Sequence, residues 1–377
     1  MKPILIVAAI SSRAYVQAAV AAGYDVIALD AFADADLTAF AKQTVKLKFD
    51  DNDLDETYFK HVFLQLNLSN IHGFLYGSLF DNCPHLLAWV AELVPVIGNS
   101  AEVLNQAKAF SFFALLDNLN IAHPDVSLDL PTVDDNWLTK QIGGSGGMQI
   151  KPAKLAQADE SFQKSKIQNI YFQKVQAGTP ISMLFVADGC TAKTIGFNQQ
   201  FIAPTTESPY RFAGAVSNIA LPSSIQAVFE HAARALTQTL HLRGINSLDA
   251  ILYEEKLWIL ELNPRLSATF QLYEQLLPVH IQSCAGAIEA YAQKIDSANA
   301  MFILYSDENI TLTKDFTWPS WVADIPLSES NKSSVKICKN RPICSVLASA
   351  KTADLAHALV LQRVEKLTEM LINNDKQ

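Results

Sequence analysis

Two apolar segments near position 250 constrain the fold of this chain more than any other feature. They read INSLDAILY and KLWILELN, and only Glu254 and Glu255 separate them. Two such runs around a short polar turn predict a β-hairpin. The second run leads into Glu261, Asn263 and Arg265. These polar groups need partners, because an unpaired polar group in a buried strand is costly.

The expected register of this hairpin brings its acidic residues together. Alternate strand residues share a face, so Glu261 and Asn263 point the same way. With the turn at Glu254 and Glu255, Asp249 lies opposite or diagonal to Glu261. Like charges at that distance repel, and a bound cation removes the repulsion. Oxygen ligands favour a hard ion such as Mg²⁺ or Mn²⁺, so the pattern predicts a metal site. The alternative is a pair of solvated carboxylates on an edge hairpin.

A glycine-rich loop upstream of the hairpin predicts an anion site. Its residues are Gly143, Gly144, Ser145, Gly146 and Gly147. Glycines allow backbone N–H groups to approach an anion closely. Lys140, three residues before the loop, adds a charge for phosphate oxygens. No Lys-Ser or Lys-Thr pair follows the last glycine, so this is not a P-loop. The alternative is a mobile surface hairpin.

Two arginines are candidates for contacts to anions. The planar fork of Arg265 suits a phosphate or a developing acyl phosphate. Arg211 lies between Tyr210 and Phe212 in the segment SPYRFAGAVSN. We expect Arg211 to hold a substrate carboxylate while the aromatic rings hold a cyclic group. The alternative for Arg211 is an ordinary loop with packed aromatic side chains.

The first hundred residues alternate between strand and helix patterns. KPILIVAAI, YDVIALD and HGFLYGS predict strands, and SRAYVQAAVAAG and PHLLAWVAELV predict helices. This alternation predicts a parallel sheet flanked by helices. The first strand-to-helix turn, AAISSRAY, lacks G-x-G-x-x-G. A dinucleotide site is therefore not supported, which argues against an oxidoreductase.

The patterns beyond Ser100 are more mixed. AEVLNQAKAFSFFALLDNLNIAHP predicts one helix, and WLTKQI and MQIK predict strands on either side of the glycine-rich loop. NIYFQKVQAG and ISMLFVADG predict strands that pair with each other. PSSIQAVFEHAARALTQTLHLRG predicts a long helix with Ser223 or Ser224 as N-cap. The remainder is β-like and closes with a helix over DLAHALVLQRVEKLTEML.

Composition limits the classes of partner. The 377 residues, half of them hydrophobic, suffice for two or three domains. The net charge of −9 without a basic run argues against nucleic acid. No segment approaches the roughly 20 apolar residues of a membrane span, and the apolar start is interpreted as a strand rather than a signal peptide. The five scattered cysteines indicate a reduced cytoplasmic protein, and their spacing does not favour a zinc site. No role is assigned to Cys338 and Cys344.

The segment from Lys108 to Arg265 resembles the ATP-grasp superfamily. The match runs in order through a lysine on a helix, Lys140 before the glycine-rich loop, QKVQAG, SLDAIL and LELNPR. The resemblance implies a mixed α/β and α+β architecture. An ATP-grasp domain would span 99–300, with a small lobe at about 110–170 and a large lobe at about 171–300. A parallel α/β domain over 1–98 would precede it, and a mixed α/β module over 301–377 with a β-rich piece would follow.

The same resemblance implies roles for individual residues. The implied metal ligands are Asp249, Glu261 and Asn263. The implied nucleotide contacts are Lys108, Lys140, the loop 143–147, Gln173, Lys174 and Val175. Arg265 would face the transferred phosphate. Many relatives carry acidic residues near the positions of Gln173 and Pro180, and this chain departs from that pattern.

The superfamily typically joins a carboxylate to an amine or thiol through an acyl phosphate, releasing ADP and phosphate. The implied partners are therefore ATP, Mg²⁺, a small carboxylate and a small amine, with a homodimer as a further expectation. YRFAGAV and NRPICSVLASA are similar to a subgroup that adds glutamate to tyramine or tyrosine in methanofuran, or to tetrahydromethanopterin. NRPICSVLAS is also similar to the small β module of carboxylating relatives. A nucleotide-binding protein without catalysis is the remaining alternative.

Overall fold

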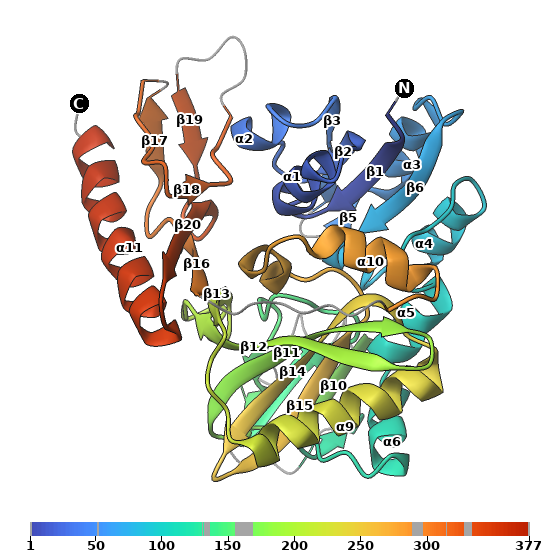
Figure 1. Cartoon of the computed structure of the whole chain (residues 1–377). Helices are drawn as coiled ribbons and strands as arrows, with labels where there is room; N and C mark the ends of the chain where they lie inside the picture. Colours follow the sequence, from blue (N-terminus) through green and yellow to red (C-terminus); the bar gives the residue numbers. More distant parts are fainter. Residues whose placement is uncertain are drawn as a thin grey trace.

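The structure is a computed structural model of the chain (Figure 1). It describes residues 2–50, 53–129, 131, 136–154, 169–288, 297–313, 315–327 and 334–375. Within these ranges, no helix combines the length and the apolar character needed to cross a membrane.

The first part of the chain forms a four-stranded parallel sheet in the order β3-β2-β1-β6. The strands are β1 (Ile4–Ala9), β2 (Asp25–Asp30), β3 (Gln43–Lys46) and β6 (Ile71–Tyr76). The helices are α1 (Arg13–Ala21), α2 (Ala35–Thr38), α3 (Glu56–Leu64) and α4 (Pro84–Ala91). Leu5 and Val7 of β1 pack with α1, whereas Ile6 and Ala8 pack with α3 and α4. Both faces are therefore covered, as the predicted alternation requires.

An eight-stranded antiparallel sheet forms the main body of the molecule, in the order β15-β14-β11-β12-β13-β16-β20-β18. Its strands are β11 (Thr179–Asp188), β12 (Ala192–Ile202), β13 (Phe212–Ser217), β14 (Arg243–Tyr253), β15 (Lys256–Asn263), β16 (Ala298–Tyr305), β18 (Val322–Ala323) and β20 (Pro342–Ala350). Because β16, β18 and β20 continue this sheet, hydrogen bonding runs across residue 300. The division at that residue stays a proposal.

Helices cover both faces of the large sheet (Figure 1). They are α9 (Ser223–Leu240), α10 (Leu276–Cys284) and α11 (Ala353–Asp375). Phe229 and Leu236 of α9 pack on Leu248 and Leu262, so the alternate residues of β14 and β15 face away from α9. The predicted N-cap of α9 is wrong. Pro222 is the N-cap, and Ser223 is already the first helical residue.

The predicted hairpin is confirmed. β14 and β15 pair through Asp249 opposite Glu261 and Ser247 opposite Asn263. Glu254 and Glu255 form the turn, with φ of 46° and 59°. Two successive left-handed residues match the twist of paired strands, which is why such a tight turn closes well.

A smaller sheet, in the order β7-β10-β8-β9, carries the glycine-rich loop. Its strands are β7 (Val126–Ser127), β8 (Trp137–Gln141), β9 (Lys151–Pro152) and β10 (Ile170–Lys174). The predicted pairing of NIYFQKVQAG with ISMLFVADG is wrong, because β10 pairs with β7 and β8 whereas β11 pairs with β12 and β14. The chain changes sheets between them at Gly178, whose φ of +135° suits glycine.

The single helix predicted from position 101 is also wrong. The structure has two helices, α5 (Ala101–Lys108) and α6 (Ser111–Asn118), because Ala109 is extended at φ −71° and ψ 155°. After the break, Phe110 and Phe113 pack against Tyr171, with ring centroids 6.0 and 5.4 Å away. One continuous helix could not present its last lysine to the hairpin and its phenylalanines to the small sheet.

A buried ion-pair cluster ties the N-terminal sheet to the C-terminal strands. Arg13 Nε lies 2.8 Å from an Asp324 oxygen and 3.6 Å from an Asp36 oxygen. Asp36 also accepts the backbone N–H groups of Asp324 and Ile325, each at 2.9 Å. Asp34 is 6% exposed beside them. We call these four ionisable residues, Arg13, Asp34, Asp36 and Asp324, the Arg13 cluster.

Candidate active site

The hairpin, the end of α5 and a loop of the N-terminal sheet build one polar cluster. Asn263 lies at its centre and bonds to groups of both charges. Its Nδ2 donates to Asp249 Oδ2 at 3.0 Å and to Glu261 Oε1 at 3.1 Å. Its Oδ1 accepts from Lys108 Nζ at 2.7 Å and from Arg265 Nη2 at 2.8 Å. The amide therefore separates two carboxylates from two cations.

Asp81 completes this cluster and was not found by sequence reasoning. Arg265 donates to both Asp81 oxygens, at 2.6 and 3.2 Å. The two side chains are 6% and 1% exposed. Burial lowers the pKa of Arg265, but Asp81 raises it above its ordinary value. Asp81 follows β6 directly after a short 3-10 turn, at the carboxyl end of a parallel strand, which is a usual place for ligand contacts. We call Asp81, Lys108, Asp249, Glu261, Asn263 and Arg265 the hairpin cluster.

The pKa values of the two facing carboxylates shift in opposite directions. Burial, followed by the charge of Glu261, raises the pKa of Asp249 to about 8. Burial alone would raise the pKa of Glu261, but Lys108 and a hydrogen bond from Asp249 lower it to about 2. Gln200, which carries no sequence signal, donates to Asp249 Oδ1 at 2.9 Å.

This donor set fits a divalent cation that also binds phosphate. Two carboxylates directly opposite each other repel, and a cation between them relieves that repulsion. Among the described residues, no group of three or more His, Cys, Asp and Glu side chains could hold a metal by itself. Mg²⁺ commonly takes one or two carboxylates and completes its shell with water and phosphate oxygens. Asn263 turns its nitrogen to the carboxylates, so its predicted role as a ligand requires the amide to rotate.

Two lysines approach the carboxylates from different elements, Lys108 from the end of α5 and Lys140 from β8. Lys108 Nζ lies 3.5 Å from Glu261 Oε2 and 3.6 Å from Asp81 Oδ2, and its side chain is 6% exposed. Lys140 lies on β8 opposite Tyr171 of β10. Burial lowers the pKa of Lys140, which Glu261 and Asp249 partly restore. Within the described ranges, Lys140 makes no ion pair, so its charge is directed at the site without a fixed partner.

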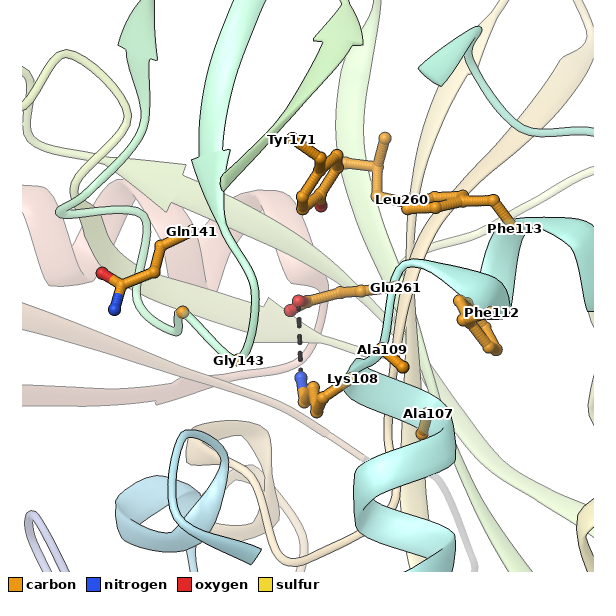
Figure 2. A pocket seen from close by; sticks show the side chains of 11 residues that line it. Ala107, Lys108, Ala109, Phe112, Phe113, Gln141, Gly143, Tyr171, Leu260 and Glu261 are labelled. Atoms are coloured by element: carbon orange, nitrogen blue, oxygen red, sulfur yellow. Dashed lines mark hydrogen bonds and ion pairs between the residues drawn. The ribbon is translucent and has the colours of Figure 1, made fainter. Parts of the chain in front are cut away.

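A cavity lies between the hairpin, α5 and the small sheet (Figure 2). It has a free volume of about 30 Å³, which is room for a water molecule and far less than a nucleotide needs. Lys108 and Glu261 meet on one side of it, and Tyr171, Phe113 and Leu260 lie on the other (Figure 2). The lining residues are Ala107, Lys108, Ala109, Phe112, Phe113, Gln141, Gly143, Gly144, Tyr171, Leu260 and Glu261.

The three residues expected at the adenine differ in their surroundings. Gln173 shares the cavity-side face of β10 with Tyr171 and is 1% exposed, and its Nε2 has no hydrogen-bond partner among the described residues. Lys174 points to solvent, 3.3 Å from Asp125 Oδ2, and Val175 is 39% exposed. The amide of Gln173 is therefore the one of the three that a ligand would satisfy. The roles of Lys174 and Val175 stay predictions.

The glycine-rich loop is docked at both ends. Gly143 has φ +73°, and a Cβ there would lie 2.7 Å from the Asp81 carbonyl oxygen. Gly146 accepts a hydrogen bond from the Phe212 N–H at 2.9 Å. Gly147 packs against the carbonyl group of Tyr210, where a Cβ would collide. In this structure the loop covers the cavity instead of standing free at the surface.

Arg211 lies next to this docked loop and is 4% exposed. Its Nε donates to the Ala203 carbonyl at 3.0 Å, and its Nη1 donates to the Asn340 carbonyl at 3.3 Å. Its guanidinium lies 3.8 Å from the centroid of the Tyr305 ring. These contacts favour the packed alternative, and the predicted contact to a substrate carboxylate stays a prediction.

Residues 107–269 match the family model described as the ATP-grasp domain. No curated protein matches the chain by sequence. One similar solved structure is the biotin carboxylase domain of 2-oxoglutarate carboxylase from Hydrogenobacter thermophilus, which was solved as a dimer with MgADP, ADP and bicarbonate. Its TM-score is 0.74, and the identity is 13% over 95% of this chain and 88% of that chain.

Two other solved structures cover nearly the whole of both chains. N5-carboxyaminoimidazole synthetase from Staphylococcus aureus, complexed with ADP, has a TM-score of 0.67 and 12% identity over 96% of this chain and 97% of that one. L-amino acid ligase from Bacillus licheniformis has a TM-score of 0.65 and 11% identity over 97% and 98%. These likenesses establish the ATP-grasp fold, as the sequence resemblance implied.

Proposed function

We propose that this protein is an ATP-dependent ligase that joins a small carboxylate to an amine and releases ADP and phosphate. One observation carries the proposal. Lys108, Glu261 and two glycines of the docked loop line one cavity, Asp249 faces Glu261 on the paired strand, and the charge of Lys140 acts on both carboxylates, all within the segment that matches the ATP-grasp model. Charge of both signs at a closed cavity is what phosphoryl transfer requires.

Asp249 and Glu261 are the proposed metal ligands, with Asn263 as the third. A bound Mg²⁺ would neutralise charge on the phosphates and orient the transferred group. Asn263 can rotate its amide toward the metal only if a new acceptor takes the place of its oxygen at Lys108 and Arg265. Phosphate oxygens supply such acceptors, so we expect metal and nucleotide to bind together.

Lys108 and Lys140 are the proposed phosphate contacts, together with backbone N–H groups of the loop 143–147. Lys108 already contacts three carboxylate or amide groups, and one of these contacts would be replaced by a contact to a phosphate oxygen. Among the described residues, Lys140 has no carboxylate partner, so its charge is free for the transferred phosphate. Both lysines are held on regular elements, which keeps the positive charges in position before the reaction starts.

Arg265 is the proposed electrostatic partner of the transferred phosphate. Asp81 holds its fork by two hydrogen bonds, so the guanidinium plane has one orientation. The docked loop would keep water away from the acyl phosphate until the amine attacks. Gln173 would satisfy its buried amide on the adenine, and the neighbouring Lys174 and Val175 would contribute backbone groups.

The substrates are proposed by class. An amino acid such as glutamate is the proposed carboxylate, and an aromatic amine such as tyramine or tyrosine is the first acceptor to test, in a cofactor-building pathway. The L-amino acid ligase among the similar folds supports amide formation. The structure solved with bicarbonate makes carboxylation the second candidate.

We also propose a homodimer, which light scattering would test.

The test is release of ADP and phosphate from Mg·ATP. Glutamate and other amino acids are combined with a panel of amines, and a parallel arm contains bicarbonate with biotin. Amine-dependent ADP release would support the ligase and identify its acceptor. Release that depends on bicarbonate would support the carboxylase instead, and AMP as product would exclude the acyl-phosphate route. Nucleotide binding without turnover in every arm would favour the non-catalytic alternative.

A further inference from the structure

The glycine-rich loop docks on a platform that lies outside the hairpin cluster. This platform is the segment 208–212, which leads into β13. Ser208 Oγ donates to the Met148 carbonyl at 3.0 Å, and the Phe212 N–H donates to the Gly146 carbonyl at 2.9 Å. The loop tip therefore rests on the platform through backbone acceptors that any opening motion must release.

The platform is itself anchored by the C-terminal strands. Arg211 is buried at its centre and reaches the carbonyl of Asn340, in the loop before β20, at 3.3 Å. Its guanidinium stacks 3.8 Å from the ring centroid of Tyr305 on β16. Tyr305 Oη donates to the Phe212 carbonyl at 2.9 Å. Phe212 is thus held by the C-terminal strands through its carbonyl and by the loop through its N–H.

We propose that Arg211 is a positioning residue that couples the C-terminal strands to closure of the glycine-rich loop. The consequence for catalysis rests on the proposed function, but the coupling itself does not. The cavity is too small for a nucleotide while the loop is docked, so the loop opens and closes in each cycle. An intact platform favours the closed state, because docking then needs no reordering of 208–212.

Arginine suits this position for a physical reason. Its planar guanidinium stacks on a ring with its face while its edges donate to carbonyl groups. Lysine offers a point charge and cannot do both. Arg211→Lys therefore keeps the charge and removes the geometry, and Tyr305→Phe keeps the stacking and removes the bond to the Phe212 carbonyl.

Hydrogen exchange of the ligand-free protein tests the coupling directly. The reporters are the amide of Phe212, which donates to Gly146, and the amide of Gly144, which donates to Gln141 within the closed loop. In Arg211→Lys, we expect these amides to exchange about tenfold faster, since the net value of one or two hydrogen bonds is lost. Tyr305→Phe should give a smaller increase at the same amides.

Arg363 provides the matched control. It also stacks on an aromatic ring, 5.5 Å from the Trp321 centroid, and donates to the Leu347 carbonyl, but it touches neither loop nor platform. Arg363→Lys should leave the reporters unchanged. Wild-type exchange of the reporters in Arg211→Lys would overturn the proposal. So would an equal increase over the whole of β16 and β20, because that result describes ordinary loss of stability.

A second measurement separates this role from substrate binding. An open loop admits water, so Arg211→Lys should raise the ADP released per molecule of product severalfold. A higher KM for the carboxylate, with unchanged exchange of the reporters, would identify Arg211 as a substrate ligand instead. If the wild-type protein turns over no nucleotide, the proposed function fails while the exchange experiment still decides the coupling.

Discussion

The hairpin cluster and the Arg13 cluster are both rich in carboxylates and both formed between distant segments of the chain. Their charge balance differs. The hairpin cluster sets Lys108 and Arg265 against its three carboxylates, with Lys140 nearby, whereas Arg13 stands alone against Asp34, Asp36 and Asp324. The hairpin cluster also borders a cavity. Cations next to facing carboxylates and free space mark a site for a charged ligand.

The Arg13 cluster uses its carboxylates as structural acceptors. Asp36 accepts two backbone N–H groups across the contact with the C-terminal strands. Arg13 bonds to Gln271 at 2.6 Å as well as to Asp324. The charged side chains of this cluster are therefore paired with protein groups from three parts of the chain. Buried ion pairs of this kind specify an arrangement without offering a place for a ligand.

The largest effect is expected from Glu261→Gln. A neutral amide removes one charge from the proposed metal site, so turnover should fall about 10³-fold or more, equivalent to about 4 kcal/mol of the activation barrier. Steady-state release of ADP measures the loss. Glu255→Gln, in the exposed turn of the same hairpin, is the control and should behave as wild type. Near-wild-type turnover in Glu261→Gln would show that the hairpin cluster, like the Arg13 cluster, is a structural contact and not a metal site.

Asp81→Asn should lower both stability and activity. The change leaves the Arg265 fork buried without its carboxylate, at a cost of about 3 kcal/mol. Urea denaturation measures the loss of unfolding free energy, and turnover of the remaining folded protein is measured below the transition. A stable variant with full activity would show that Asp81 neither holds nor orients Arg265.

Arg13→Gln should lower stability by a similar amount, about 3 kcal/mol, because Asp324 and Asp36 lose their cation. Unlike Asp81→Asn, it should leave the turnover of folded protein unchanged at a temperature below unfolding. The two variants, compared at equal folded fraction, separate a site from a structural contact. A loss of turnover in folded Arg13→Gln would show that the Arg13 cluster, like the hairpin cluster, contributes to activity.

The smallest effect concerns pH. Burial, followed by Asp324 and Asp30, raises the pKa of Asp34 to about 8, against the opposing charge of Arg13. The folded protein then holds a proton that the unfolded chain has lost, so stability should fall as pH rises from about 4 toward 8. Asp34→Asn removes this term. Between pH 6 and 7.5 the wild-type unfolding free energy should fall by about 2 kcal/mol more than that of the variant. Equal pH profiles would show that Asp34 is ionised in the fold.

Local patterns predicted the hairpin and the parallel sheet because their information lies in neighbouring residues. A period of two, a polar turn and charged residues at the strand end place Asp249 opposite Glu261 without knowledge of the rest of the chain. Alternating apolar runs likewise predicted β1, β2 and β6. Errors arose where a pattern needed a distant partner. The residues of β10 do not indicate which of the two sheets the strand joins. The helix break after Lys108 goes with the packing of Phe113 against Tyr171, which is distant in the sequence.

The sequence by itself determined the carboxylate pair, the glycine-rich loop and the lysines beside them, because each lies within one strand, turn or helix. Only the tertiary structure decided what surrounds them. Asp81 meets Arg265 across 184 residues, and Arg211 meets Asn340 across 129. Such contacts depend on how sheets and loops pack, and a side chain's role follows from the groups that satisfy it. Arg265 and Arg211 have the same chemistry, and their neighbours give one a carboxylate beside the cavity and the other a ring and two carbonyl groups.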